Sequence, residues 1–411
     1  MKKLLALSLA FILLVSCLPG CEQNAAPTTA ATTTQATEPT LDAESAAILA
    51  QRRQLVADYM RSMANYVWRA EETVDYFTSG QTILHIEAGR LYRGIPYTHA
   101  ANTLNAFCSF TTENSDGTAT LSGIHPNLMG NLKDARVGND CSGAVQTAWA
   151  QLGADIQPII TTYMIPANGF IRLGNFYAPA ENNKGSNGLC VANGEQVMYE
   201  SYAFLQLADA VVYAKASGHT MLVTGNTVVR KEDGTIDGEN SFITTVHQTS
   251  SYMKKEAKAF DETYGEDVYQ IYGIDDVYTY AKLFESGYLP LTCQALTDPN
   301  WQIPEPAVTD SVAQPGAENM FEGEFVSNYF ISFVDCIVKD ESGAVVQQAR
   351  AFSDRDSIRN FQLSGFQADP TMVQGGVDVS LLPAGAYEIS FVCQIVTGES
   401  FTVRQLQYIC E

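Results

Sequence analysis

The chain has 411 residues, 46% of them hydrophobic, and carries a formal net charge of −22 at pH 7. This acidity argues against nucleic acid as a partner, because phosphate binding depends on Lys and Arg side chains that neutralise the polyanion. It also gives the surface no electrostatic attraction to anionic lipid. The length is sufficient for two domains with separate hydrophobic cores.

The first residues predict an export signal and a lipid anchor. Two lysines precede an apolar run over residues 4–16, which is too short to span a bilayer permanently. The following Leu-Val-Ser-Cys ends at Cys17 and resembles the lipobox of bacterial lipoproteins, and Leu-Pro-Gly-Cys, ending at Cys21, fits nearly as well. We therefore expect a lipoprotein signal peptide over residues 1–21, lipid attachment at Cys17 or Cys21, and an extracytoplasmic protein anchored to the bacterial cell membrane.

A flexible tether and an amphipathic helix are predicted next. Residues 22–41 are rich in Ala, Thr and Pro and have almost no large apolar side chain to bury, which predicts a disordered linker. Over residues 42–80, as far as about Phe77, apolar residues recur at steps of three and four between charged ones. We expect this N-terminal helical segment to pack on the domain that follows it, over residues 81–298.

One cysteine occupies a position that favours a reactive thiol. Cys141 follows the polar pair Asn139-Asp140 and precedes apolar residues at helical spacing, up to a stop signal at Gly153. The first turn of a helix presents unpaired N–H groups and the positive end of the helix dipole, and both favour a thiolate over a thiol. We therefore expect a helix that begins near Cys141, with Asp140 as its N-cap.

The region after this helix divides into a loop-rich part and a strand-rich part. Residues 153–202 have no steady period and predict long loops with short ordered pieces, which could form a lid or one wall of a cleft. Dense strand signals separated by turn residues follow. They predict an antiparallel meander with strands at residues 209–214, 220–224, 227–230 and 241–247.

A second, all-β domain is predicted at the C-terminus. The proline-rich residues 299–320 are typical of an interdomain linker, and residues 321–411 contain short alternating strands without a helical period, as in a small Ig-like sandwich. The alternation places Cys336 and Cys393 on inward faces, where they could meet across the core. We prefer two buried thiols there to a disulfide.

Two histidines complete the requirements for cysteine chemistry. Acyl transfer by a thiol requires a base and a third polar group that orients the base. His219 begins an apolar strand directly after a glycine turn, and His247 lies near the end of a later strand of the same meander. Adjacent strands lie roughly 5 Å apart, so side chains at matching ends can form hydrogen bonds. The cysteines show no paired C-x-x-C spacing, so we expect neither a metal nor another cofactor.

These motifs resemble a family of cell-wall enzymes. Gly-Ile-Pro-Tyr ending at Tyr97, Asp-Cys-Ser-Gly around Cys141, Gly-His at His219 and a later strand ending in a polar residue occur in the order found in NlpC-type cysteine peptidases and the related CHAP amidases. The resemblance implies a papain-like α+β fold, in which the cysteine helix packs on an antiparallel sheet. Two departures are the replacement of the family's Gly-Asp by Ala208-Asp209 and the long insertion before His219.

The resemblance also implies roles for individual residues. Cys141 would be the nucleophile, His219 the general base, and His247 the third residue, with Gln248 as its substitute if the strand register slips by one. Tyr97 would contact the substrate or the oxyanion. Asp140 and Ser142 flank the nucleophile where relatives hold the amine of the peptidoglycan stem peptide.

The resulting hypothesis is a monomeric lipoprotein hydrolase that cleaves peptide or amide bonds in peptidoglycan stem peptides. Two alternatives stay open. The domain could be catalytically inactive and bind a wall polymer or a protein, or the enzyme could transfer the acyl group to an amine rather than to water.

Overall fold

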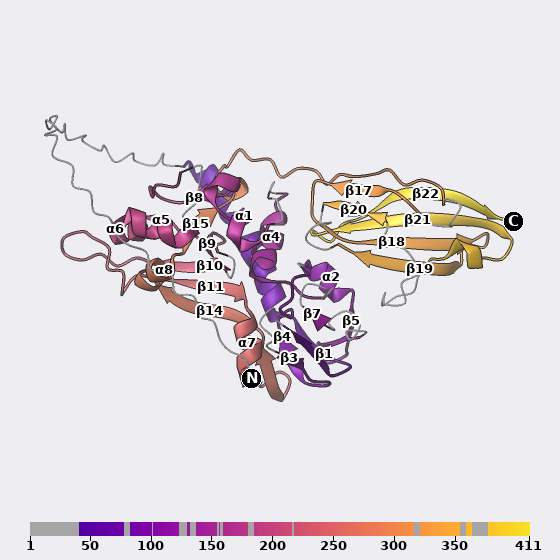
Figure 1. The fold of residues 1–411 in the computed structure, drawn as a ribbon, viewed down its shortest axis with the longest axis horizontal. Coiled ribbons are helices and arrows are strands. Elements are labelled where there is room, and N and C mark those ends of the chain that lie inside the picture. Colours follow the sequence, from indigo (N-terminus) through magenta and orange to yellow (C-terminus); the bar gives the residue numbers. More distant parts are fainter. Residues whose placement is uncertain are drawn as a thin grey trace, which may run out of the picture. The chain divides into compact units, whose positions relative to one another are not determined.

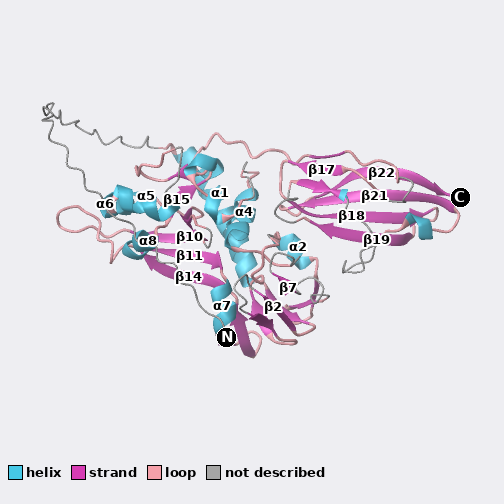
Figure 2. Ribbon diagram, in the orientation of Figure 1, coloured by secondary structure: helices cyan, strands magenta, loops and turns pink. Residues whose placement is uncertain are grey.

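The structure is a computed structural model that contains both helices and sheets, which confirms the mixed α+β class (Figures 1 and 2). It describes residues 41–77, 83–100, 102–122, 130–131, 137–153, 156, 159–179, 185–215, 218–315, 321–353, 359–363 and 377–411. The predicted signal peptide, both lipidation candidates (Cys17 and Cys21) and nearly all of the predicted linker lie outside these residues. Within the described part of the chain, no helix combines the length and the apolar character needed to cross a bilayer.

The N-terminal helix is shorter than predicted. Helix α1 (Ala43–Asn65) starts at the N-cap Asp42, which accepts a hydrogen bond from the Ser45 N–H at 2.7 Å. The chain then continues as strands β1 (Val67–Ala70) and β2 (Val74–Phe77), so the prediction of a helix as far as Phe77 is wrong. The reason is tertiary: Trp68 is the cross-strand partner of Tyr92, and their rings stack with centroids 5.0 Å apart.

Strand β1 belongs to a six-stranded sheet with both parallel and antiparallel pairings. Its order is β12-β13-β4-β1-β6-β5. The members other than β1 are β4 (Leu91–Arg93), β5 (Thr111–Glu113), β6 (Ala119–Leu121), β12 (Lys258–Asp261) and β13 (Glu266–Gln270). A smaller sheet joins β2 to β3 (Ile83–Ile86) and β7 (Gly130–Asn131), and the short helix α2 (Leu104–Cys108) precedes β5.

A second six-stranded sheet carries the predicted histidines. All its pairings are antiparallel, in the order β14-β11-β10-β9-β15-β8. The strands are β8 (Ile171–Arg172), β9 (Ala210–Tyr213), β10 (His219–Thr227), β11 (Phe242–Gln248), β14 (Tyr272–Thr279) and β15 (Leu289–Thr292). The separate strand expected at residues 227–230 is absent. Strand β10 ends at Thr227, and the side chains that follow it, Val228 and Val229, are exposed. Helix α4 (Cys141–Ala150) packs on β10 and β11 and also against α1.

Two adjacent arginines attach α1 to the part of the chain that carries the site. Arg53 forms an ion pair with Asp209 at 2.8 Å, with side-chain exposures of 8% and 0%. Arg52 donates to the backbone carbonyls of Ala295 at 3.1 Å and Asp298 at 2.9 Å. The predicted N-terminal segment is therefore part of the same packed core as α4 and its sheet.

The region predicted as loops contains two helices in its described part, α5 (Gly185–Asn193) and α6 (Glu195–Tyr202). Short 3-10 turns precede them at Thr161–Tyr163 and Pro166–Asn168. Helix α6 packs against α8 (Tyr280–Ser286), where the rings of Tyr199 and Phe284 meet edge to face at 6.1 Å. Both helices pack on α8, a segment distant in sequence, which explains why their own weak periodicity did not predict them.

The C-terminal part consists of two antiparallel sheets that share one hydrophobic core. One contains β16 (Val308–Asp310), β17 (Glu324–Ser327) and β20 (Asn360–Gln362), and the other contains β18 (Ile331–Asp340), β19 (Val345–Phe352), β21 (Gly385–Ile395) and β22 (Ser400–Cys410). Cys336 and Cys393 are buried thiols without a disulfide, which confirms the preferred interpretation. They lie on the neighbouring strands β18 and β21 of one sheet, not across the core as expected.

Candidate active site

The predicted nucleophile lies where its sequence context places it. Cys141 is the first residue of α4, and only 6% of it is exposed. Asp140 is the N-cap, as predicted: its Oδ1 accepts hydrogen bonds from the Gly143 N–H at 2.7 Å and from the Ser142 hydroxyl at 2.9 Å. The thiol therefore lies at the positive end of the helix dipole, an environment that favours the thiolate.

The segment before Cys141 is held by the Tyr97 segment, which is distant in sequence. Tyr97 and Asn139 form an isolated parallel β-bridge, and the Asn139 N–H donates to the Pro96 carbonyl at 3.1 Å. Gly138 has a φ of +111°, and a Cβ at this position would lie 2.4 Å from the same carbonyl oxygen. A glycine is therefore required for the close approach that brings Tyr97 to the cavity next to Cys141.

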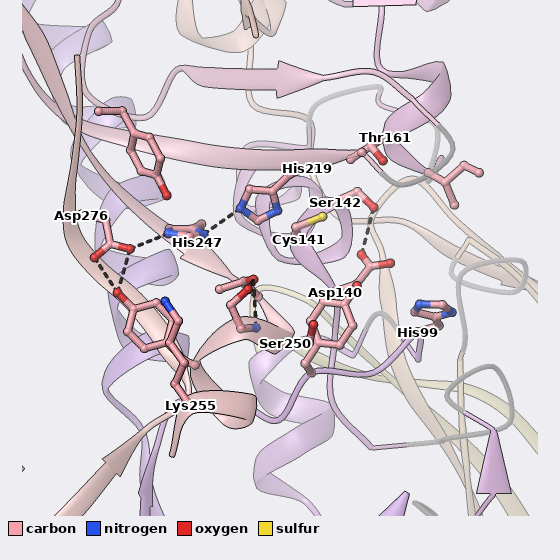
Figure 3. Close-up of a pocket in the computed structure, with 17 residues that line it drawn as sticks. His99, Asp140, Cys141, Ser142, Thr161, His219, His247, Ser250, Lys255 and Asp276 are labelled. Atoms are coloured by element: carbon pink, nitrogen blue, oxygen red, sulfur yellow. Dashed lines mark hydrogen bonds and ion pairs between the residues drawn. The ribbon is translucent and has the colours of Figure 1, made fainter. Parts of the chain in front are cut away.

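The two predicted histidines contact each other across adjacent strands. Leu222 of β10 is paired with Val246 of β11. Because strand side chains alternate, His219 and His247 lie on one face of the sheet. His219 Nε2 and His247 Nδ1 are 2.8 Å apart, which is a hydrogen bond. In Figure 3 the sulfur of Cys141 points toward the ring of His219, and both line the same cavity.

The environment of His219 keeps its imidazole neutral. Burial removes water from the ring, and a charge on neighbouring His247 would repel a charge on His219. Together these effects lower the pKa of His219 to about 3, although the carboxylates of Asp140 and Asp276 act in the opposite direction. A neutral imidazole has an available lone pair, so His219 can accept the thiol proton, and the imidazolium that forms would be stabilised by the adjacent thiolate.

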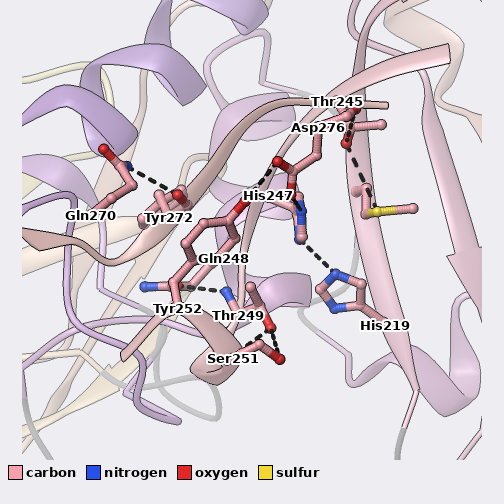
Figure 4. Close-up of polar contacts among 11 residues, drawn as sticks. His219, Thr245, His247, Gln248, Thr249, Ser251, Tyr252, Gln270, Tyr272 and Asp276 are labelled. Carbon is pink, nitrogen blue, oxygen red and sulfur yellow. Dashed lines mark hydrogen bonds and ion pairs between the residues drawn. The ribbon is translucent and has the colours of Figure 1, made fainter. Parts of the chain in front are cut away.

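The structure adds Asp276 and Tyr252, which the sequence analysis did not identify. His247 Nε2 lies 2.9 Å from Asp276 Oδ2, and the Tyr252 hydroxyl donates to both carboxylate oxygens, at 2.6 and 2.8 Å (Figure 4). Asp276 is on β14 and Tyr252 on the short helix α7 (Ser250–Lys255). No local signal linked Asp276 to His247, because the two are 29 residues apart and strands of the other sheet lie between them in the sequence.

The alternative third residue lies elsewhere. The buried side chain of Gln248 donates to the Ile95 carbonyl and accepts from the Thr249 N–H at 2.6 Å. It does not line the cavity, so of the two candidates the structure brings only His247 to His219. The remaining predicted residues, Tyr97, Asp140 and Ser142, line the cavity together with Cys141.

The cavity has a volume of about 930 Å³ and carries charges of both signs. Asp140 lies on one side of Cys141 in Figure 3, and Lys255 lies on the other, beyond His247. Thr161, Ser250 and Tyr278, which each carry a hydroxyl group, are among the residues of its wall. Among the residues that the structure describes, no group of three or more His, Cys, Asp and Glu side chains is placed to hold a metal ion.

The Ala208-Asp209 departure does not disturb the backbone that supports the histidine strand. Ala208 has a φ of +71°, a conformation that glycine adopts without strain. Its carbonyl accepts from the Trp149 indole N–H of α4 at 2.8 Å, and its N–H donates to the Val223 carbonyl of β10 at 2.9 Å. These bonds hold the turn in place despite the alanine.

Comparisons with known proteins do not identify a family. No family model matches the sequence, and no curated protein matches it either. One solved structure that the chain resembles is described as the tetra-tandem repeat in the extending region of a large adhesion protein. The match has 13% identity, covers 49% of this chain and 41% of that one, and has a TM-score of 0.19, which is too low to support an argument about fold or function.

Proposed function

We propose that the protein is a cysteine hydrolase that cleaves peptide or amide bonds in peptidoglycan stem peptides. The observation that carries the proposal is the set Cys141, His219 and His247: three residues from α4, β10 and β11 that line one cavity, with the two imidazoles 2.8 Å apart. A thiol at a helix N-terminus, a neutral base and an orienting group are the three parts that acyl transfer by cysteine requires.

The arrangement of elements supports a papain-like domain of the NlpC type. The cysteine begins a helix packed on an antiparallel sheet, and the base lies on a strand that the helix contacts. For the C-terminal part, two antiparallel sheets with a common core support an Ig-like sandwich. None of its described residues lines the cavity, and in the proposal it binds the wall, binds a protein or acts as a spacer.

In the proposed reaction His219 takes the proton of Cys141, and the thiolate attacks the peptide carbonyl carbon. The backbone N–H of Cys141 and the hydroxyl of Tyr97 would stabilise the resulting oxyanion. His219 then returns the proton to the leaving amine, the C–N bond breaks and a thioester remains. Water, deprotonated by His219, hydrolyses the thioester and releases the acid and the thiol.

The charges of the cavity support a short peptide that carries both an amine and a carboxylate. Asp140 and Ser142 provide oxygens for a free amine beside the nucleophile. Lys255 provides a cation for a carboxylate at the other end. Stem peptides contain both groups, and an exported, lipid-anchored protein, as the first 21 residues predict, would meet them in the cell wall.

Digestion of purified muropeptides tests the proposal, with product masses as the readout. The wild type should release two fragments whose masses add up to the mass of the substrate plus one water, and Cys141→Ala should release neither. Cys410→Ala, which removes a half-buried thiol from β22, is the matched control and should cleave normally. Binding of muropeptides without cleavage by the wild type would refute the hydrolase and favour the binding lipoprotein. A product joined to an added amine would identify acyl transfer instead.

A further inference from the structure

The hydrogen bond between His219 and His247 is linked to a carboxylate outside the predicted triad, that of Asp276. His219, His247, Asp276 and Tyr252 form one continuous chain of contacts (Figure 4). A contact between two neutral imidazoles can run either way, because each ring has one N–H and one lone pair. The distances alone therefore leave two arrangements for His219 and His247, and only one of them leaves a basic nitrogen for the thiol.

We propose that Asp276 is a positioning residue that sets the tautomers of His247 and, through it, of His219. A carboxylate only accepts hydrogen bonds, so His247 must carry its proton on Nε2 to donate to Asp276. Its Nδ1 is then an acceptor, and His219 must donate from Nε2. The lone pair of His219 is thereby placed on Nδ1, the nitrogen that Figure 3 shows on the side of Cys141. The inference rests on the proposed function, because it concerns the base of the same site.

The surroundings of Asp276 favour the ionised form that this role requires. Burial acts to raise its pKa, but hydrogen bonds from His247 and Tyr252 and the positive charge of Lys255 outweigh burial and hold the pKa below its usual value. Tyr278, on the same strand, and His219, across the sheet, also interact with it. At neutral pH the group facing His247 is therefore an acceptor.

The local sheet geometry is adapted to bring this carboxylate to His247. The pairing of β11 with β14 shifts between Thr245 and Val246, so that Asp275 is an extra residue, with a φ of +55°. Because side chains alternate along a strand, this bulge moves Asp276 onto the face that carries His247. A non-glycine residue at positive φ is strained, and such strain often marks a functional site.

A glycine clears the space that the contact occupies. Gly273 is the direct cross-strand partner of His247. A Cβ at this position would lie 2.2 Å from His247 Nε2 and 2.8 Å from Asp276 Oδ2. Any other residue would therefore have to displace the ring or the carboxylate. The bulge and the glycine are two independent features that serve the same contact.

Nitrogen-15 NMR of the histidine rings tests this inference, because ring ¹⁵N shifts distinguish the two neutral tautomers. In the wild type both rings should carry the proton on Nε2. In Asp276→Asn the amide side chain can donate as well as accept, so the variant should give a mixture of tautomers in which part of His219 carries its proton on Nδ1. Alkylation of Cys141 by iodoacetamide should then slow by about 100-fold, the lower end of what a general base contributes. Asp276→Glu keeps an acceptor and should restore the wild-type tautomers at least in part.

The matched control is Asp275→Asn, which removes the neighbouring carboxylate. Asp275 pairs with Arg61 at 3.1 Å on the surface, and asparagine tolerates its backbone conformation. Its spectrum should match the wild type. If His219 and His247 both still carry their proton on Nε2 in Asp276→Asn, the inference is overturned. This holds even if alkylation slows, because Asp276 would then act on structure alone. Neither readout needs a cell-wall substrate, so a wild type that shows these tautomers but cleaves no muropeptide would refute the proposed function and leave this inference standing.

Discussion

Replacing Arg53 by methionine should strongly destabilise the protein, because it leaves a buried carboxylate without its cation. Arg53 and Asp209 are 2.8 Å apart, and the Asp209 side chain is fully buried. The guanidinium also donates to the carbonyls of Leu207 at 2.7 Å and Leu296 at 2.9 Å. Removal of one partner from a buried ion pair typically costs about 3–5 kcal/mol.

The cost of Arg53→Met should depend on pH in a defined direction. Burial raises the pKa of Asp209 in the folded protein even though Arg53 opposes this, and the loss of Arg53 must raise it further. A carboxyl whose pKa is higher in the folded state stabilises that state only while it is protonated. The cost should therefore be smaller at pH 5 and grow toward pH 7, by at most about 1.4 kcal/mol per pH unit.

Urea unfolding of the wild type and Arg53→Met at pH 5, 6 and 7 measures both effects. The control Arg61→Met breaks an exposed pair with Asp275, with side-chain exposures of 38% and 58%, and should cost less than about 1 kcal/mol. The double variant Arg53→Met/Asp209→Leu should recover much of the loss, because no charge is left buried. A cost below about 1 kcal/mol for Arg53→Met at every pH would show that the pair does not hold α1 on the site.

Three further predictions concern the site itself. The folded pKa of His219, about 3, lies below the unfolded value of 6.5. The free energy of unfolding that neutral His219 contributes is therefore complete above pH 6.5 and is lost as pH falls, by at most about 2 kcal/mol between pH 7 and pH 5. In urea unfolding His219→Gln should lack this loss. If the stability of the wild type and of His219→Gln changes in parallel with pH, the lowered pKa of His219 is contradicted. Gly273→Ala should slow alkylation of Cys141 by about 100-fold, because its methyl group would lie 2.2 Å from His247 Nε2. The control Gly385→Ala should leave the rate unchanged, because the nearest atom to its methyl group would be 3.7 Å away. Lys255→Glu should raise KM about tenfold, equivalent to roughly 1.4 kcal/mol, for peptides with a free carboxylate. If KM rises equally for the same peptides with that carboxylate amidated, Lys255 does not recognise the carboxylate.

The members of the predicted triad were accessible from sequence because each has a local signal. Cys141 follows a capping aspartate and precedes a helical pattern, and α4 begins where that pattern indicates. His219 follows a glycine turn, and β10 begins there. Choosing between His247 and Gln248 required the register, since a shift by one residue reverses the face of every side chain.

Other features depend on contacts that no local pattern records. The pattern of α1 continues past Asn65 in the sequence, but in the structure Trp68 lies in a strand, where it pairs with Tyr92 and stacks on its ring. The helix α6 is held by aromatic contacts with α8. Such long-range contacts override local propensity and are invisible in a window of one segment.

Local patterns in the sequence were enough to predict the mixed α+β content, the start of the cysteine helix and the strands that carry His219 and His247, because capping, turn chemistry and alternation act over a few residues. The contact between Asp276 and His247 could be found only in the folded chain. That contact depends on a bulge at Asp275, on the absence of a side chain at Gly273 and on the pairing of two strands, and these are properties of chain segments brought together by folding.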